Sequence, residues 1–190
     1  MLDNFLEIQI AEKIITETGD LIKKISTDTD VKKHSERVCK YSLILAKEYG
    51  LNLQKRVDIC TGALLHDIGK IYINKNILNK KEKLNEDEKC LINYHSQIGY
   101  LNLKPYKLNA PVLDIVHHHH ERLDGNGYPE KLFGNEISLL TQLVSVADVF
   151  DALTSDRVYR NKMKYDKAFI IMKEDKGLNQ LAIHILQTKF

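Results

Sequence analysis

Histidine and aspartate occur at positions that hydrophobic spacing predicts to be buried. His34 lies between Val31 and Val38 on an apolar stripe, and His95 follows Ile92 by three residues. Residues three or four apart lie on one face of a helix, so both imidazoles should point inward. The same reasoning applies at three further places, which are His119, Asp148 and the pair His66 and Asp67 at the end of an apolar run.

Buried polar groups need partners, and a shared metal ion is one way to supply them. A single inward histidine is usually a hydrogen-bonded core residue. Several such sites change that judgement, because one unpaired buried carboxylate removes a large part of a net stability of about 5 to 15 kcal/mol. Imidazoles and carboxylates without thiolates favour iron, manganese, nickel or zinc over a structural cysteine-type zinc site. Histidine content does not choose among these metals.

Helices are predicted to position these side chains. The chain has only three prolines and nine glycines, and its apolar residues recur at helical spacing. We therefore predict an all-α fold, a single-domain helical bundle. The expected helices cover about residues 4–25, 30–49, 54–68, 85–99, 111–121, 138–155 and 165–187.

Capping residues support several of these boundaries. Gly50 suits the residue after a helix, and Asn85 with Glu88 forms a capping-box pattern. Ser138 suits an N-cap, while residues 124–129 read Asp-Gly-Asn-Gly-Tyr-Pro and predict a tight turn. The predicted helix at 111–121, which carries the run of four histidines, must therefore end near residue 121.

Length, charge and hydrophobic content limit the number of domains and the kinds of partner that we expect. With 190 residues, 43% of them hydrophobic, the chain suits one domain of ordinary size. A formal net charge of +2 predicts no nucleic-acid polymer as partner, although a small anion remains compatible. The sequence shows no signal peptide and no apolar run near the roughly 18 residues of a membrane helix, so we expect a cytoplasmic protein without membrane contact.

The cysteines do not suggest a disulfide framework. Cys39, Cys60 and Cys90 are an odd number and lack paired spacing. Reduced thiols that act as small core residues are therefore expected.

The order of the motifs resembles the HD-GYP family. His66-Asp67-Ile68-Gly69-Lys70 is followed by His119-His120-Glu121, by the turn at 124–129 and by Asp148. The match extends from His34 to Arg160. An isolated His-Asp dipeptide would be weak evidence, whereas this ordered series is specific.

The resemblance implies a helical HD-type fold with two divalent metal ions, most readily iron or manganese, with nickel and zinc as alternatives. The matching ligands are His34, His66, Asp67, His95, His119, His120 and Asp148, with Asp67 as the bridge. The family's histidine pair stands directly before the glutamate, which selects His119 and His120 from the four-histidine run. His117 and His118 are then expected to be exposed, or His117 to support a ligand from behind. Some members bind a third metal with a glutamate four residues before the first histidine. Asp30 stands there and is one methylene shorter, which argues against a third ion.

The implied activity is hydrolysis of the bacterial second messenger cyclic di-GMP to pGpG, with pGpG or GMP as the end product left open. Two ions about 3.5 to 4 Å apart can share a hydroxide that attacks phosphorus. Asp67 and Lys70 are the expected catalytic residues, because the Lys70 ammonium could reach a phosphate oxygen or assist the leaving group. The expected substrate-binding residues are Lys70, Gly127, Tyr128, Arg157 and Arg160, the two arginines gripping the second phosphate or a guanine.

Two alternatives stay open at this point. The chain could be a regulator that binds a cyclic dinucleotide with little turnover and contacts a signalling partner around Tyr128, or an HD phosphohydrolase for another cyclic dinucleotide. Residues 1–28 are expected to form an N-terminal helix that packs on the bundle or forms a homodimer, and residues 29–190 the catalytic domain. Nothing in the sequence indicates an iron–sulfur, flavin or nicotinamide site.

Overall fold

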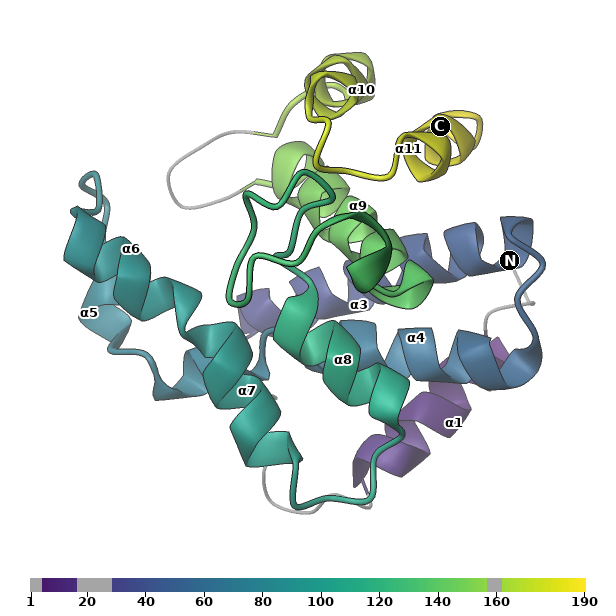
Figure 1. Cartoon of the computed structure of the whole chain (residues 1–190), viewed down its shortest axis with the longest axis horizontal. Coiled ribbons are helices and arrows are strands. Elements are labelled where there is room, and N and C mark those ends of the chain that lie inside the picture. The colour runs from purple at the N-terminus through teal and green to yellow at the C-terminus, as the bar shows by residue number, and fades with distance from the viewer. Residues whose placement is uncertain (1–4, 17–28, 157–161) are drawn as a thin grey trace.

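The computed structural model describes residues 5–16, 29–156 and 162–190. Helices are the regular elements of these ranges, so the predicted all-α fold is confirmed (Figure 1). They are α1 (Phe5–Thr16), α3 (Thr29–Glu48), α4 (Leu53–Leu65), α5 (Lys75–Leu78), α6 (Glu86–Asn93), α7 (His95–Leu103), α8 (Ala110–His118), α9 (Leu139–Thr154), α10 (Tyr165–Glu174) and α11 (Gln180–Gln187), with short 3₁₀ helices at η1 (Ile68–Tyr72) and η2 (Gly134–Glu136).

Four helices form the centre of the bundle. In Figure 1, α3 and α4 run side by side, α8 lies in front of α4, and α9 packs across α3. The apolar faces of these helices share one core, whose fully buried members include Leu43, Ile59, Ile115, Val144 and Phe150. Helices α10 and α11 cover α9, and α5 and α6 lie at the opposite edge. The polar residues of interest sit where α3, α4, α8 and α9 meet.

Several predicted boundaries are found in the structure. Asn85 accepts a hydrogen bond from the backbone N–H of Glu88, whose side chain accepts one from Asn85 in return. Ser138 caps α9 by accepting from the backbone of Thr141. Gly50 follows α3 with φ of +65°, a conformation that glycine adopts without a steric cost.

Two expected helices are each divided in two. The helix from residue 85 ends at Asn93, and α7 begins at His95, after the single residue Tyr94. Leu91, one turn before His95, is 49% exposed. At the start of α7, the carbonyl of His95 lies so close to Gly69 that a Cβ on Gly69 would collide with it.

The last expected helix is also interrupted, between α10 and α11. The backbone of Leu123 donates a hydrogen bond to the carbonyl of Gly177, and a Cβ at Gly177 would lie 2.9 Å from that of Arg122. Close packing of two turns thus ends α10, and Asn179 starts α11 by accepting from the backbone of Ala182. Apolar residues at helical spacing stand on both sides of the break, which explains why the sequence predicted one helix.

The cysteines differ from their prediction. Cys39 on α3 and Cys60 on α4 are buried core residues, as expected, but they form a disulfide with Cα atoms 5.0 Å apart. The expectation of reduced thiols is therefore wrong for this pair, because the packing of α3 on α4 brings the two residues together. Cys90 is a free thiol and is exposed rather than in the core.

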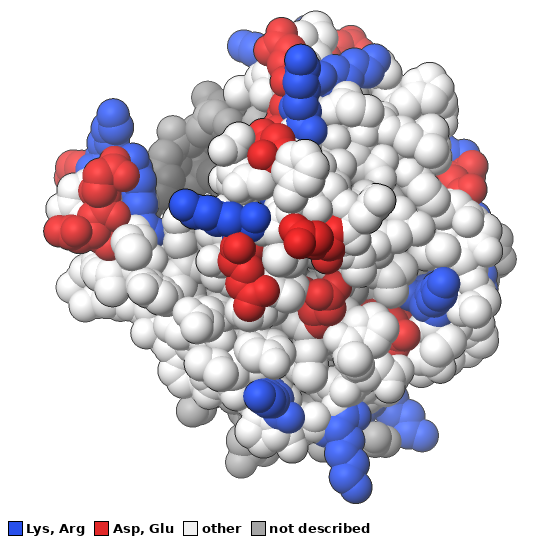
Figure 2. Space-filling view, viewed as in Figure 1, with Lys and Arg blue, Asp and Glu red and all other residues white. Residues whose placement is uncertain are grey.

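The described part of the N-terminal segment packs on the bundle. Ala11 of α1 is fully buried in the main core, and Arg56 of α4 donates to Glu7 over 2.8 Å. Figure 2 shows basic and acidic side chains interspersed on the visible face. Within the described ranges, no helix has both the length and the apolar character needed to cross a membrane.

Candidate metal centre

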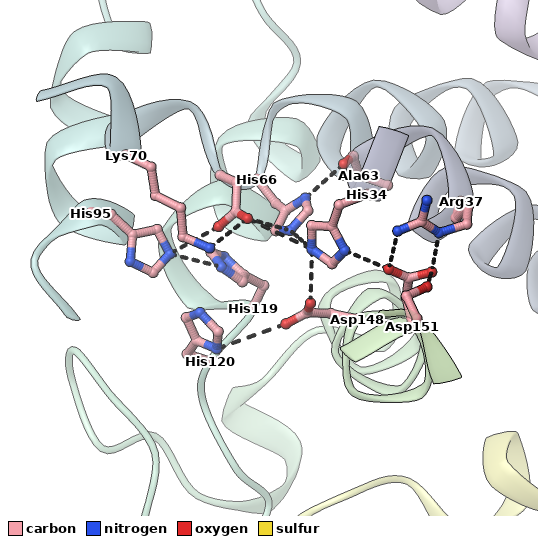
Figure 3. Close-up of polar contacts among 12 residues, drawn as sticks. His34, Arg37, Ala63, His66, Lys70, His95, His119, His120, Asp148 and Asp151 are labelled. Atoms are coloured by element: carbon pink, nitrogen blue, oxygen red, sulfur yellow. Dashed lines mark hydrogen bonds and ion pairs between the residues drawn. The ribbon is translucent and has the colours of Figure 1, made fainter. Parts of the chain in front are cut away.

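Seven side chains from five parts of the fold converge beneath the ends of α4 and α8 (Figure 3). They are His34 from α3, His66 and Asp67 from the end of α4, His95 from the start of α7, His119 and His120 after α8, and Asp148 from α9. The structure therefore brings together all of the sequence-predicted metal ligands. Each helix contributes through the face that it turns to the core. For this reason each of these residues lies on, or at the end of, a stripe of apolar residues in the sequence.

The seven side chains form two adjoining groups. One contains His34, His66 and Asp148, and the other contains Asp67, His95, His119 and His120. In each group, one ligand atom per residue lies within 4.8 Å of the others. Nε2 of His34 lies 3.3 Å from Nε2 of His66 and 3.1 Å from Oδ1 of Asp148.

Asp67 lies between the groups and faces each with a different oxygen. Its Oδ1 is 3.3 Å from Nε2 of His95, and its Oδ2 is 3.4 Å from Nε2 of His66. Oδ1 is buried without a hydrogen-bond partner, while Oδ2 accepts from Nζ of Lys70 at 2.6 Å. A buried carboxylate oxygen without a donor is the environment that a cation would complete.

Hydrogen bonds on the far side of the rings fix the imidazole tautomers. Nδ1 of His66 lies 2.7 Å from the carbonyl of Ala63, and Nδ1 of His95 lies 2.7 Å from that of Ile92. Because a carbonyl only accepts, each Nδ1 must carry the proton, which leaves a lone pair on each Nε2. His119 is held in the same way by backbone carbonyls of α8.

These lone pairs point at one another. Nε2 of His95 and Nε2 of His119 are 3.2 Å apart, although neither carries a proton in the tautomers just described. Two nitrogens at this spacing suit one ion with metal–nitrogen distances of about 2.0 to 2.1 Å. The donor set of imidazoles and carboxylates therefore fits divalent metal ions.

Electrostatics favour neutral imidazoles in the group that contains His95, His119 and His120. Burial lowers the pKa of His95 to about 4, and it lowers the pKa of His119 and His120 well below the usual value. Burial opposes ionisation of Asp67, but the nearby Lys70 ammonium holds its pKa well below the ordinary range. An anionic carboxylate among neutral imidazoles is the protonation state that binds metal.

His34 differs because two carboxylates surround it. Burial lowers its pKa, but hydrogen bonds to Asp148 and Asp151 outweigh this effect and raise the pKa to about 9. Asp151 and Arg37 were not predicted as site residues. Nδ1 of His34 donates to Oδ2 of Asp151 over 2.7 Å, and Arg37 Nε donates to Oδ1 over 2.6 Å. Their signal in the sequence was spacing, because Asp151 follows Asp148, and Arg37 follows His34, by three residues on one helix.

The turn after α8 is tied to this centre by Glu121. Its buried carboxylate accepts from the backbone N–H groups of Glu130 at 2.6 Å and Leu132 at 3.1 Å. Gly127 lies directly against this segment, since a Cβ there would be 2.4 Å from the nitrogen of Arg122. Close packing thus accounts for a glycine at position 127, while its contact with substrate stays a prediction.

Tyr128 and Lys70 lie at the edge of the centre. The ring of Tyr128 is 4.8 Å from that of His120, and burial raises the pKa of its hydroxyl. Lys70 belongs to η1 and extends its Nζ to Asp67. Both are therefore close enough to the ligand groups to contact a molecule bound there.

The other predicted residues lie elsewhere. Arg157 and Arg160 fall outside the described residues. Asp30 is in the first turn of α3, and its side chain is likewise outside what the structure describes. His117 is buried rather than exposed, and it stacks on Tyr100 instead of joining the two ligand groups.

The family model described as "HD domain" matches residues 20–180. Among curated proteins, the 3'3'-cGAMP-specific phosphodiesterase 3 of Vibrio cholerae serotype O1 is 40% identical over 168 residues, which are 86% of this chain and 35% of that protein. The cyclic di-GMP phosphodiesterase of Thermotoga maritima is 36% identical over 178 residues, which are 87% of this chain and 48% of that protein. The chain thus spans about a third to a half of the length of these relatives.

A solved structure shares the fold. Bd1817, a HDG"Y"P protein from Bdellovibrio bacteriovorus, superposes with a TM-score of 0.74 over 96% of this chain and 60% of that chain. Its sequence is 21% identical, so the likeness is one of fold.

Proposed function

Because the chain belongs to the HD domain family, we propose that it is a metal-dependent phosphodiesterase of the HD-GYP type that hydrolyses cyclic di-GMP to pGpG, with GMP as the alternative end product. The observation that carries this proposal is the position of Asp67, with one oxygen toward each group of imidazoles. A carboxylate placed in this way suits a bridge between two ions. Two ions are the usual means of cleaving a phosphodiester in a site without a protein nucleophile.

Each of the two ligand groups would hold one divalent ion, iron or manganese. His34, His66 and Asp148 would hold one, and His95, His119 and His120 the other, with Asp67 shared. When bound, such ions neutralise phosphoryl charge and make water nucleophilic near neutral pH. Asp151 keeps the Nδ1 proton of His34 on the outer side of its ring, so that Nε2 faces the centre.

Lys70 and Tyr128 would act on the substrate directly. The Lys70 side chain is 22% exposed and reaches Asp67, so it can also reach a phosphate oxygen held beside that carboxylate. There its ammonium would stabilise charge on the phosphoryl group or on the departing ribose oxygen. Tyr128, packed beside His120, would border the base or ribose. We assign Arg157 and Arg160 to the second phosphate or a guanine, as their family positions suggest.

The alternative substrate is another cyclic dinucleotide, and one observation favours it. The Vibrio cholerae relative at 40% identity is named for 3'3'-cGAMP, whereas the Thermotoga maritima relative is named for cyclic di-GMP. These substrates differ in one base, so the choice depends on contacts to a single guanine or adenine edge. Residues 29–190 would carry the catalytic unit, with α1 packed on it through Ala11.

The test is hydrolysis by protein purified without oxygen and loaded with iron or manganese. Cyclic di-GMP, 3'3'-cGAMP and cyclic di-AMP are supplied separately, and linear products are separated by chromatography. We expect pGpG from cyclic di-GMP, and none from an Asp67→Ala variant. A faster reaction with 3'3'-cGAMP would establish the alternative substrate. Tight binding of a cyclic dinucleotide without product, in protein with its metal content verified, would contradict hydrolysis and favour a regulator.

A further inference from the structure

The four-histidine run contains two residues that the two ligand groups do not use. His117 and His118, together with Glu130 from the following turn, form a third group of potential ligands. One ligand atom from each lies within 4.8 Å of the other two. This group lies on a different side of α8 from His119, whose Nε2 faces His95.

His118 has the hydrogen-bond arrangement of a metal ligand. Its Nδ1 lies 2.8 Å from Oδ1 of Asp114, and Oδ2 of Asp114 accepts from the hydroxyls of Ser138 at 2.6 Å and Thr141 at 2.7 Å. The fixed carboxylate accepts the Nδ1 proton, which leaves Nε2 as the ring nitrogen that could bind a metal. A carboxylate behind a histidine in this way orients the ring and increases its strength as a ligand.

The Nε2 atom of His118 faces the carboxylate of Glu130. It is buried, makes no hydrogen bond, and lies 3.4 Å from Oε2 of Glu130. A lone pair beside a carboxylate oxygen is unfavourable unless a cation or a proton lies between them.

The other two members are placed to complete a site. The His117 ring stacks on Tyr100 with centroids 4.5 Å apart, which fixes its plane. Neither of its ring nitrogens accepts or donates a hydrogen bond within the described residues. Glu130 is held at its backbone by Glu121, while its side chain is 53% exposed and able to close on an ion. Figure 2 shows acidic side chains near the middle of the visible face, where α8 and its following turn lie in Figure 1.

We propose that His117, His118 and Glu130 bind one borderline divalent cation, such as zinc or nickel, at a site separate from the centre around Asp67. Two imidazoles and one carboxylate, with water in the open position, are a common ligand set for these ions. The ion would link the end of α8 to the turn that carries Tyr128. Because Tyr128 packs on His120, occupancy would hold this turn against the metal centre. The site goes beyond the proposed hydrolysis and does not depend on it.

Zinc binding to the full chain tests the site without any measurement of turnover. Zinc stoichiometry and affinity are measured by calorimetry and elemental analysis in the wild type and in Asp67→Ala, each with and without Glu130→Gln. We expect Glu130→Gln to weaken one binding event about tenfold or more in both backgrounds. Cobalt in place of zinc should give a visible absorption band in Asp67→Ala that Glu130→Gln reduces.

The matched control is Glu82→Gln, which makes the same change at another exposed glutamate. His118→Gln is the second variant, and circular dichroism verifies that each variant is folded before metal is added. Equal zinc affinity and stoichiometry with and without Glu130→Gln and His118→Gln would overturn the site. Loss of hydrolysis alone would leave these binding measurements unaffected, so failure of the proposed function and failure of this site are distinguishable.

Discussion

Nδ1 of His34 lies 2.7 Å from Oδ2 of Asp151, on the side of the ring opposite the metal centre. The same carboxylate accepts two hydrogen bonds from Arg37, which hold it in position. Asp151 is almost completely buried and touches neither ligand group except through His34. It is therefore a positioning residue, whose effect must pass through the orientation and basicity of one imidazole.

Replacing Asp151 by asparagine should weaken metal binding without unfolding the protein. The amide keeps the shape of the carboxylate but loses its charge, so the Nδ1 proton of His34 is held less firmly. We expect metal affinity to fall about 10- to 100-fold, measured by competition with a chelator. Asp166→Asn, at an exposed aspartate of α10, is the control for the loss of one charge. Unchanged affinity in Asp151→Asn would show that Asp151 serves stability alone.

Replacing Lys70 by methionine should reduce turnover while metal content is retained. Methionine keeps most of the length of the side chain and removes the ammonium that lies 2.6 Å from Asp67. If this charge stabilises the transition state, kcat should fall about 100-fold or more. The measurement is steady-state hydrolysis of the cyclic dinucleotide, with metal content determined on the same sample. Lys75→Met is the control at an exposed lysine. A normal kcat, or loss of the metal, would remove Lys70 from the catalytic residues.

The metal-free protein should lose stability as the pH falls from about 6.5 to about 4. Burial lowers the pKa of His95 from 6.5 to about 4 in the folded protein. In this window the unfolded chain binds more protons, so the free energy of unfolding falls by roughly 3 kcal/mol for His95 alone. His119 and His120 act in the same direction.

His34 has the opposite effect at higher pH. Its folded pKa is raised to about 9, so its contribution is complete below 6.5 and is lost as the pH rises toward 9. Urea unfolding in the presence of chelator, at about pH 4.5, 6.5 and 9, should therefore give the greatest stability near 6.5. His95→Gln should flatten the acid side of this profile. This variant separates the contribution of His95 to the pH dependence of stability from that of the carboxylates. Equal slopes in the wild type and His95→Gln would contradict the assignment.

The sequence predicted which faces of the helices carry polar residues, but it could not predict how those faces meet. Helical spacing placed His34, His95 and Asp148 inward one at a time, and the motif order gave their resemblance to a known family. That Nε2 of His95 faces Nε2 of His119 depends on the crossing of α7 and α8, which is a tertiary property. Spacing places Asp151 one turn after Asp148, but its contact with His34 depends on the position of α9 against α3, which is why it was missed.

The helix breaks were missed for a related reason. At Tyr94 the apolar period continues through the break, and apolar residues stand on both sides of Gly177. Beside each break the backbone is in close contact with a distant segment, which is Gly69 for His95 and Arg122 for Gly177. The spacing of apolar residues along the chain carries no information about contacts with a distant segment. The capping residues Asn85 and Ser138 were predicted because their hydrogen bonds are local to four residues.

Of the glycines beside the metal centre, Gly69 should tolerate substitution least. A Cβ at this position would collide with the carbonyl oxygen of His95 and would lie 2.8 Å from the nitrogen of Gly99, so α7 would have to move. Because Gly69 lies between Asp67 and Lys70, the same movement would disturb Asp67 relative to His95. We expect Gly69→Ala to destabilise the fold by about 1 to 3 kcal/mol and to reduce metal affinity.

Gly134→Ala separates this collision from backbone strain. Gly134 has φ of +54°, and no other atom lies within 4 Å of the place that a Cβ would take, so alanine there meets conformational strain without a steric neighbour. Its expected cost is about 1 kcal/mol, with no change in metal affinity. Thermal unfolding and metal titration of both variants provide the comparison. If Gly69→Ala bound metal as tightly as Gly134→Ala, the close contact of η1 with α7 would not determine the position of Asp67 relative to His95.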